Sequence, residues 1–308
     1  MRRRWFGTIV ALTLGLAFAS AVPAGCAKNA ATGRWQIQLL SREQAIQTGT
    51  DLAPQLTAEY GGASADTVAS EYVREIGEKL AATTEADYPD LPWEFTLLDS
   101  DVINAFALPG GKVFISRGLA SRMRNEAQLA AVLGHEIGHV TARHVNDRMV
   151  QATVANGGQA LLDALLNGQN EALQQVGQTL YGFGGQSTIL AYGRSQEIES
   201  DALGMRYMNN VGYNPRGQRQ VMEILAKASG DNREWEFLST HPYPETRIRR
   251  IDESLKADYS DVASTANGFF AARFQERMLD RIGWIQVSVD DAPHWCGVCQ
   301  ARAIASAD

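Results

Sequence analysis

The stretch that decides the fold is LAAVLGHEIGHVTARHV, residues 129–145. It contains the motif His-Glu-x-x-His, in which His135 and His139 are four residues apart. Side chains with this spacing share one face of an α-helix, so two imidazoles can bind the same zinc ion. Glu136 follows the first histidine and can accept a proton from a water that zinc has acidified to a pKa of about 7.

The residues around the motif predict a buried helix. Leu129, Val132, Leu133, Ile137 and Val140 recur at helical spacing and form an apolar face. Two histidines and a carboxylate on such a helix are costly unless they have partners. In a chain with five histidines, the motif arises by chance only about 1 time in 100. The sequence therefore favours a metal site over coincidence.

Length and charge limit the remaining interpretations. The chain has 308 residues, of which 45% are hydrophobic, which is enough for one large domain or a domain with appendages. The formal net charge is −7, and no run of basic residues stands out. This balance argues against a nucleic-acid partner and agrees with a soluble, acidic protein.

The N-terminus has the order of an export signal. Three arginines are followed by the uncharged residues 5–22 and then by Pro23-Ala24-Gly25-Cys26. The last three residues resemble the end of a bacterial lipobox, so we predict a signal peptide over 1–25 and lipidation of Cys26. That predicts a periplasmic protein anchored by lipid to the membrane, most simply the outer membrane. Secretion without lipid and a retained anchor remain alternatives.

The two other cysteines lie near the C-terminus. Cys296 and Cys299 are predicted to form a local disulfide, which suits an oxidising compartment. A redox or metal role for the pair, together with His294, is the alternative. The short chain after Cys299 argues against a thioredoxin-like unit, since that motif precedes a long helix.

Periodicity and turn residues predict mostly helices with one small sheet. The residues 102–108 and 112–115 form two extended runs around Pro109-Gly110-Gly111, which predicts a hairpin next to the motif helix. The helix over 41–60 is expected to break at Pro54, and the polar residues 27–35 before it are expected to form a tether. Further helices are expected at 66–82, 195–208, 215–229, 245–256 and 269–284, and further strands at 93–98 and 285–289.

Residues 148–193 differ in composition from the rest. They are rich in Gln, Gly, Asn and Ala, and contain a patch of leucines. We interpret this stretch as a mobile helical hairpin or lid between the two halves of the site, with possible membrane contact. A plain solvent-facing excursion is the alternative.

A hydrolytic zinc site needs a third protein ligand beside an open position. His144 does not fit the spacing in which a third histidine follows the motif, because Ala142 and Val145 stand where that pattern requires Gly and His. We therefore interpret His144 as structural.

The later helix offers better candidates. Glu197 and Asp201 are four residues apart and share a face, whereas Glu199 points elsewhere. One carboxylate can bind zinc while the other orients a ligand histidine. An acidic, exposed helix without a metal role remains the alternative.

Five stretches together carry a family resemblance. The chain is similar to the family-48 zinc metallopeptidases of the gluzincin type, which include the CAAX prenyl endopeptidases, the HtpX-type proteases, the mitochondrial Oma-type proteases and periplasmic lipoprotein relatives. The stretches occur in this order over residues 104–251: NAFALPGGKVFISRGL, HEIGHVTARH, SQEIESDALG, GYNP and LSTHPYPETRIRRI.

The resemblance implies an α+β fold and a domain plan. A mostly helical, zincin-type metallopeptidase domain would span 66–257, with a small sheet beside the motif helix and the insertion at about 148–193. The residues 26–65 would form the tether and an N-terminal helix, and 258–308 a C-terminal extension.

The resemblance also implies roles for single residues. With one zinc ion per chain, Glu197 would be the third ligand and Asp201 would support it. Asn104, Ala105 and Phe106 would offer a strand edge to an extended substrate. His241 would either stabilise the oxyanion or occupy the open zinc position at rest. Arg247 would hold substrate carbonyls or anchor the two carboxylates of the later helix.

These inferences predict a zinc-dependent endopeptidase that cleaves envelope proteins for quality control. The CAAX enzymes embed their site among membrane-spanning helices. This chain has no long uncharged run after residue 25, so prenylated substrates are not expected. The alternative is an envelope assembly factor or chaperone with a latent, autoinhibited protease site.

Overall fold

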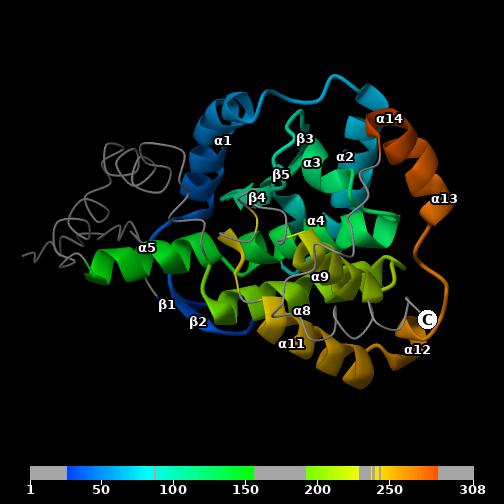
Figure 1. Cartoon of the computed structure of the whole chain (residues 1–308). Coiled ribbons are helices and arrows are strands. Elements are labelled where there is room, and N and C mark those ends of the chain that lie inside the picture. The colour runs from blue at the N-terminus through cyan, green and yellow to red at the C-terminus, as the bar shows by residue number, and fades with distance from the viewer. Residues whose placement is uncertain are drawn as a thin grey trace, which may run out of the picture.

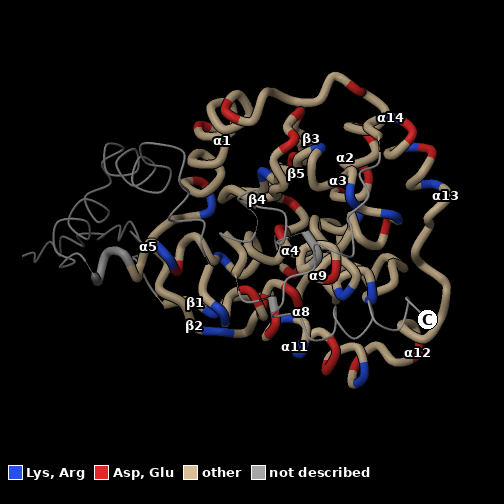
Figure 2. Tube along the Cα trace, viewed as in Figure 1, with Lys and Arg blue, Asp and Glu red and all other residues tan. Residues whose placement is uncertain are grey.

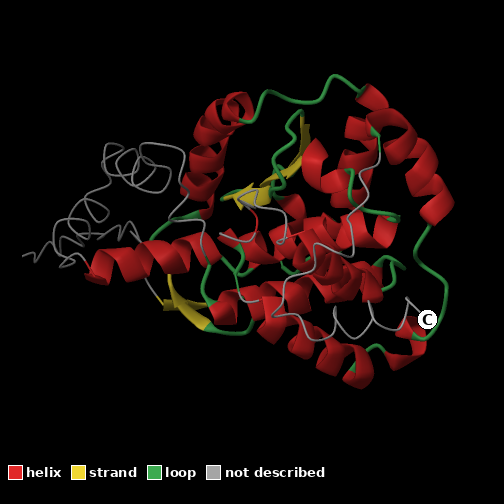
Figure 3. Cartoon of the chain, in the orientation of Figure 1, coloured by secondary structure: helices red, strands yellow, loops and turns green. Residues whose placement is uncertain are grey.

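The computed structural model describes residues 26–86, 88–155, 192–228, 237, 240–242 and 244–283. Helices dominate these residues, and the strands are confined to one sheet of two strands and one of three (Figure 3). The prediction of a mostly helical α+β fold is confirmed. The signal region, the larger part of the insertion, the strand expected at 285–289, and Cys296 and Cys299 lie outside the described residues.

Helix α4, Glu126–Thr141, carries the metal motif and passes through the middle of the molecule (Figure 1). Asn125 caps its N-terminus by accepting a hydrogen bond from the backbone N–H of Gln128 at 3.0 Å. Every residue of α4 except Val140 is buried. The helix ends before Arg143, which has a left-handed φ of 56°, and α5, His144–Ala155, begins directly afterwards. The quoted stretch therefore spans two helices.

Helix α8, Arg194–Asn210, lies against α4 with almost no space between the two backbones. A Cβ atom on Gly204 would lie 2.9 Å from the carbonyl carbon of Gly134, which is closer than real contacts allow. One turn before Gly204 in α8, Ser200 donates a hydrogen bond from its hydroxyl to the carbonyl of His135 at 3.0 Å. This close crossing sets the later acidic residues directly beside the histidine motif.

The three-stranded sheet has the order β3-β5-β4, with β3 at Glu94–Leu98, β4 at Ala105–Leu108 and β5 at Lys112–Ser116. Strands β4 and β5 are antiparallel with Phe106 opposite Phe114, while β3 runs parallel to β5. Gly110 and Gly111 form the turn with φ values of 77° and 97°. The predicted hairpin is confirmed, and its edge strand β4 packs on α4.

Helix α1, Arg42–Glu59, is continuous, so the expected break at Pro54 is wrong. Ser41 and Gln44 close a capping box at its N-terminus. Beyond the proline, Leu56 packs in a cluster with Phe106 and Phe114 of the sheet. Packing of this kind offsets the one backbone hydrogen bond that proline removes.

Helix α2, Thr67–Ala81, matches its prediction and begins at the capping residue Asp66. The helices expected at 195–208, 215–229 and 245–256 are also present, as α8, α9 (Arg216–Ala228) and α11 (Pro244–Ala257). The segment expected as one helix from 269 contains a π-helical turn in its middle. The remaining elements are η1 (Tyr88–Asp90), α3 (Arg117–Ala120), α12 (Ser260–Ala263), α13 (Ala271–Phe274), η2 (Gln275–Leu279) and α14 (Asp280–Ile282).

The N-terminal residues expected as a tether have a defined structure instead. Strands β1, Cys26–Lys28, and β2, Trp35–Ile37, pair in antiparallel register, and β2 contacts α5. Two buried side chains, Asn29 and Gln36, hydrogen-bond the end of α4 at the carbonyls of Thr141 and Ala142. The sequence missed this segment because its polar, small residues look like those of a free linker.

Acidic and basic residues alternate over the outer helices, and the described part of the chain presents no continuous basic stripe in Figure 2. None of the described helices combines the length and apolar character that a membrane crossing requires.

Candidate metal centre

The two motif histidines point into one buried space. His135 and His139 are each at most 2% exposed, and their Nε2 atoms lie 3.0 Å apart. Because both side chains leave α4 on the same face, one turn apart, neither needs to move for the two nitrogens to share a ligand.

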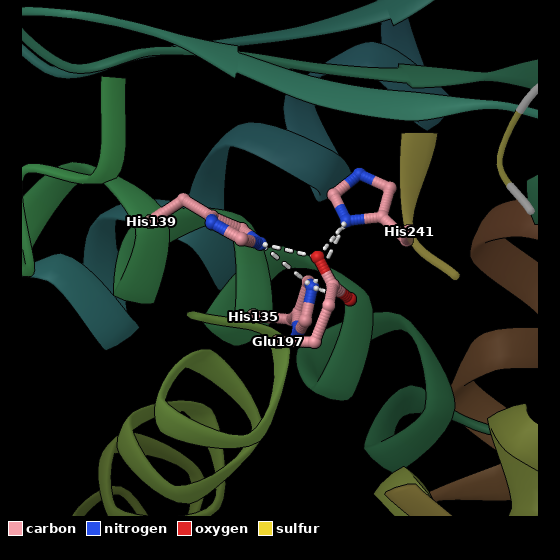
Figure 4. Close-up of side chains that lie close together, drawn as sticks. All are labelled: His135, His139, Glu197 and His241. Atoms are coloured by element: carbon pink, nitrogen blue, oxygen red, sulfur yellow. Dashed lines mark hydrogen bonds and ion pairs between the residues drawn. The ribbon is translucent and has the colours of Figure 1, made fainter. Parts of the chain in front are cut away.

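Two further donors complete the group. Glu197 from α8 places its carboxylate oxygens 3.5 Å from the Nε2 atoms of His135 and His139. The Nδ1 atom of His241 lies 3.2 Å from His135 Nε2 and 3.1 Å from Glu197 Oε1. Figure 4 shows the four side chains converging. All four donor atoms lie within 4.8 Å of one another, and all four residues are buried.

The arrangement fits zinc. Tetrahedral ligands that bind zinc at 2.0–2.2 Å are about 3.3 Å apart. The individual donor pairs given above lie 3.0 to 3.5 Å apart, within a group that spans at most 4.8 Å. Imidazole nitrogens with one carboxylate form the donor set of many hydrolytic zinc enzymes. The residues of this group therefore suit zinc in chemistry and spacing.

Asp201 and Arg247 support the inner side of the group. Asp201 Oδ1 lies 2.8 Å from His135 Nδ1, so that this nitrogen donates and Nε2 is left to bind metal. Arg247 donates two hydrogen bonds to Asp201, at 2.8 and 2.7 Å, and its Nη1 lies 2.7 Å from Glu197 Oε2. Gln218, on α9, donates to Asp201 Oδ1 at 2.7 Å. These contacts agree with the anchoring alternative for Arg247.

The surroundings move the pKa values of the two histidines in opposite directions. Burial alone would lower the pKa of His135, but hydrogen bonds to Asp201 and Glu197 raise it to about 9. For His139, burial holds the pKa well below its usual value, despite the hydrogen bond to Glu197. Without a metal ion, the two imidazoles therefore carry different charges at neutral pH.

Glu136 is fully buried, and among the described residues neither of its carboxylate oxygens has a hydrogen-bond partner. Its Oε1 atom lies 3.5 Å from Nε2 of His241. Burial raises the pKa of Glu136. A buried carboxylate costs free energy unless something else bonds it, and its place beside the metal donors fits a base that acts on a water there.

His241 is fixed from several sides. The ring of Phe237 stacks on it at 4.4 Å between centroids, and its backbone N–H donates to the Phe237 carbonyl at 2.7 Å. Tyr192 donates from its backbone to Thr240, the residue before His241, at 2.9 Å. The Tyr192 ring also stacks on His139 at 3.7 Å. Sequence reasoning missed Phe237 and Tyr192, because both lie outside the recognisable motifs.

His144 does not contribute a metal donor, but it contacts one. Its Nδ1 lies 2.8 Å from Nδ1 of His139, and its Nε2 lies 3.0 Å from Glu199 Oε2. This contact could not be predicted from helical spacing, because α4 ends before His144.

The residues expected to pair with substrate line the motif helix but are covered. Asn104, Ala105 and Phe106 are at most 2% exposed. Asn104 precedes β4, and its side chain donates to the hydroxyl of Tyr60 at 2.9 Å. Strand β4 is the edge of its sheet among the described residues, so the substrate role remains a prediction that requires this edge to be uncovered.

Comparison with protein families gives one match across most of the domain. A model described as Peptidase family M48 matches residues 68–255. The match includes each residue of the candidate centre and leaves out the N-terminal strands and α1.

Individual relatives agree with this match. The beta-barrel assembly-enhancing protease of Escherichia coli (strain K12) is 28% identical over 247 residues, which cover 77% of this chain and 50% of the relative. The mitochondrial metalloendopeptidase OMA1 of Schizosaccharomyces pombe is 32% identical over 185 residues, or 60% of this chain and 52% of the relative. The chain thus spans about half the length of these curated relatives.

Proposed function

Because the chain belongs to peptidase family M48, we propose that it is a zinc-dependent endopeptidase that cleaves proteins of the cell envelope. The observation that carries this proposal is the buried group of four metal donors beside an unpartnered glutamate. In the proposed site, His135, His139 and Glu197 hold the zinc ion, and Asp201 and Arg247 keep His135 and Glu197 in place.

Each residue has a defined task in this proposal. Zinc, when bound, acts as a Lewis acid on the peptide carbonyl and on the attacking water. Glu136 accepts the proton of that water on its free carboxylate and later passes the proton to the leaving amine. The hydrogen bond to Asp201 keeps the His135 ring in the tautomer that binds metal through Nε2.

His241 decides whether the site is open. Of the two alternatives, the distances favour the resting one, because His241 Nδ1 stands at the fourth corner of the donor group. The water and the substrate carbonyl need that corner, so we propose that His241 leaves it before cleavage. The variant His241→Ala should then cleave faster than the wild type, whereas an oxyanion role predicts slower cleavage.

The direct test of the function uses Glu136→Gln. This change removes the base but keeps the size of the side chain and all metal donors. With an unfolded protein such as casein, cleavage should fall by a factor of about a hundred or more, while zinc content stays at one per chain. Cleavage by this variant at the wild-type rate would remove Glu136 from the mechanism. Glu197→Ala should instead lose the metal.

The proposed substrate class and location follow from the relatives and from the N-terminal sequence. The names of the relatives mention beta-barrel assembly and mitochondria, and the N-terminal sequence indicates export and a lipid on Cys26. We propose misassembled envelope proteins as substrates and a lipid-anchored, periplasmic location. Capture of bound proteins by Glu136→Gln identifies the substrates, and fatty-acid labelling that Cys26→Ser abolishes tests the anchor.

The second candidate is an envelope assembly factor with a latent protease site, which the position of His241 favours. The two candidates differ in one experiment. If Glu136→Gln fully restores the phenotype of a deletion strain, then binding is the main role. If it fails while zinc binding is intact, the main role is cleavage.

A further inference from the structure

We propose that Arg34, Glu199 and His144 form a positioning relay that orients His139 for zinc, so that the N-terminal strands complete the metal site. This inference rests on the proposed zinc function. It concerns three residues whose role does not follow from the metal motif, and one of them, Arg34, lies outside the family match over 68–255.

The first step is the hydrogen bond between the two histidines. His139 presents Nε2 to the other metal donors, so in a neutral ring that binds metal the proton sits on Nδ1. Within the part of the chain that the structure describes, the acceptor for that proton is Nδ1 of His144, which is 2.8 Å away. His144 must therefore accept on Nδ1 and carry its own proton on Nε2.

The second step follows from the first. The Nε2–H of His144 donates to Glu199 Oε2 at 3.0 Å. The direction of both hydrogen bonds is thus determined once His139 binds a metal ion. A chain that leads from a ligand histidine to a carboxylate raises the basicity of the ligand and holds its ring. In this protein the imidazole of His144 is inserted between the ligand histidine and the carboxylate.

The third step connects Glu199 to the N-terminal segment. Arg34 grips the carboxylate with two hydrogen bonds, from Nε at 2.9 Å and from Nη2 at 2.7 Å. Paired contacts of this kind fix orientation as well as charge. The turn that carries Arg34 is closed by the backbone bonds from Asn29 N to Arg34 O at 2.7 Å and from Gly33 N to Asn29 O at 2.8 Å.

The same segment also fixes the end of the metal helix. Asn29 donates to the carbonyl of Thr141 at 2.9 Å, and Gln36 donates to the carbonyl of Ala142 at 2.7 Å. Carbonyls in the last turn of a helix lack partners within the helix. The N-terminal strands supply those partners, so the segment holds both α4 and the relay that ends at His139.

The test measures zinc affinity by competition with a chelator, in the full chain carrying Glu136→Gln so that no self-cleavage interferes. Loss of such outer partners typically weakens metal binding by about 10- to 100-fold. We expect His144→Ala to reach about tenfold, and His144→Asn, which keeps an acceptor near Nδ1, to recover most of that loss. Arg34→Ala should weaken binding by about three- to tenfold, because it acts through two intermediates.

Arg206→Ala is the matched control. Arg206 has the same 42% side-chain exposure as Arg34 and contacts the same segment through the carbonyl of Ala31. Its hydrogen-bond partners among the described residues, Ala31 and Glu85, do not belong to the relay. Zinc affinity should be unchanged in this variant. Equal weakening by Arg34→Ala and Arg206→Ala would show general loosening and overturn the relay.

A second readout guards against variants that fold poorly. Glu199→Gln keeps the shape of the side chain, and the absorption bands of bound Co²⁺ report ligand geometry directly. We expect these bands to shift in Glu199→Gln and to stay constant in Arg206→Ala. Unchanged bands together with wild-type zinc affinity would refute the relay. Neither measurement needs a substrate, so a protein that cleaves nothing but shows both effects would refute the protease and keep the relay.

Discussion

The two ligand histidines of α4 are supported in different ways. His135 bonds Asp201 directly, and Arg247 and Gln218 surround that carboxylate in an interior where no side chain is more than 4% exposed. His139 reaches its carboxylate only through His144, and the chain of contacts ends at Arg34, whose side chain is 42% exposed. The contacts that hold His135 form an inner support, which is closed to solvent. The contacts that hold His139, through His144 and Glu199 to Arg34, form an outer support, which opens to solvent.

The two histidines also differ in where their supporting residues lie relative to the family match. Every partner of His135 lies within the family match over 68–255, whereas the outer support ends on a segment before it. Buried charge networks lose much free energy when one member is removed, while exposed ion pairs contribute little. We therefore expect the inner support to contribute mainly to the free energy of unfolding, and the outer support mainly to zinc affinity.

The largest expected effect is on the inner support. Asp201→Ala leaves Arg247 buried without its main partner, which should lower the free energy of unfolding of the zinc-free protein by about 3–5 kcal/mol. Denaturant unfolding measures this change. Asp201→Asn keeps the hydrogen-bond acceptor and should lose less. A loss below that of the outer variants would reverse the comparison.

The second effect is on the pH dependence of zinc binding. With a pKa of about 9 in the zinc-free protein, His135 is protonated at pH 7 and must release that proton to bind metal. Apparent zinc affinity should rise about 100-fold from pH 7 to pH 9, or about tenfold per pH unit, and level off above. Competition titrations with a chelator of known pH dependence check this. In Asp201→Asn the slope should flatten, because the carboxylate that raises the pKa is gone.

A smaller effect is expected where the N-terminal strands meet α4. Gln36→Ala removes the partner of the buried Ala142 carbonyl and should destabilise the protein by about 1–3 kcal/mol. Thermal unfolding of the zinc-loaded protein measures this loss. The exposed Gln47 donates a hydrogen bond to Asp51 on the surface of α1, so Gln47→Ala should stay within about 0.5 kcal/mol of the wild type. If both variants unfold alike, the segment does not support the helix end.

The smallest effect is the salt dependence of the outer support. Arg34 and Glu199 are partly exposed, so their ion pair should contribute less than about 1 kcal/mol to stability and weaken between 0.05 and 1 M salt. A double-mutant cycle with Arg34→Ala and Glu199→Gln at both salt concentrations gives the coupling. A coupling that exceeds this value and ignores salt would mean that the outer support is as closed as the inner one.

The inner support was within reach of the sequence. The spacing of His135 and His139 and that of Glu197 and Asp201 each define a helix face, and the family resemblance supplied His241 and Arg247. Helical periodicity is a local property, so it predicts which residues of one helix point together.

The outer support was not within reach. His144 follows a left-handed residue, so the spacing from His139 has no helical meaning. Arg34 reaches Glu199 across 165 positions of the chain, from a segment with the composition of a linker. The continuity of α1 through Pro54 was missed for a related reason, because long-range packing on the sheet outweighs a local helix breaker.

Gly134 and Gly204 give the metal centre a property that no ligand provides. Where they meet, the two helices touch through bare main chain, so the span from the imidazoles to the carboxylate is set by a contact that cannot be compressed. A single methyl group at either position would act as a spacer, displacing Glu197 from the histidines without altering any coordinating atom. The contact between these two glycines therefore helps to set the distance between the ligands, and with it the size of the ion that fits between them.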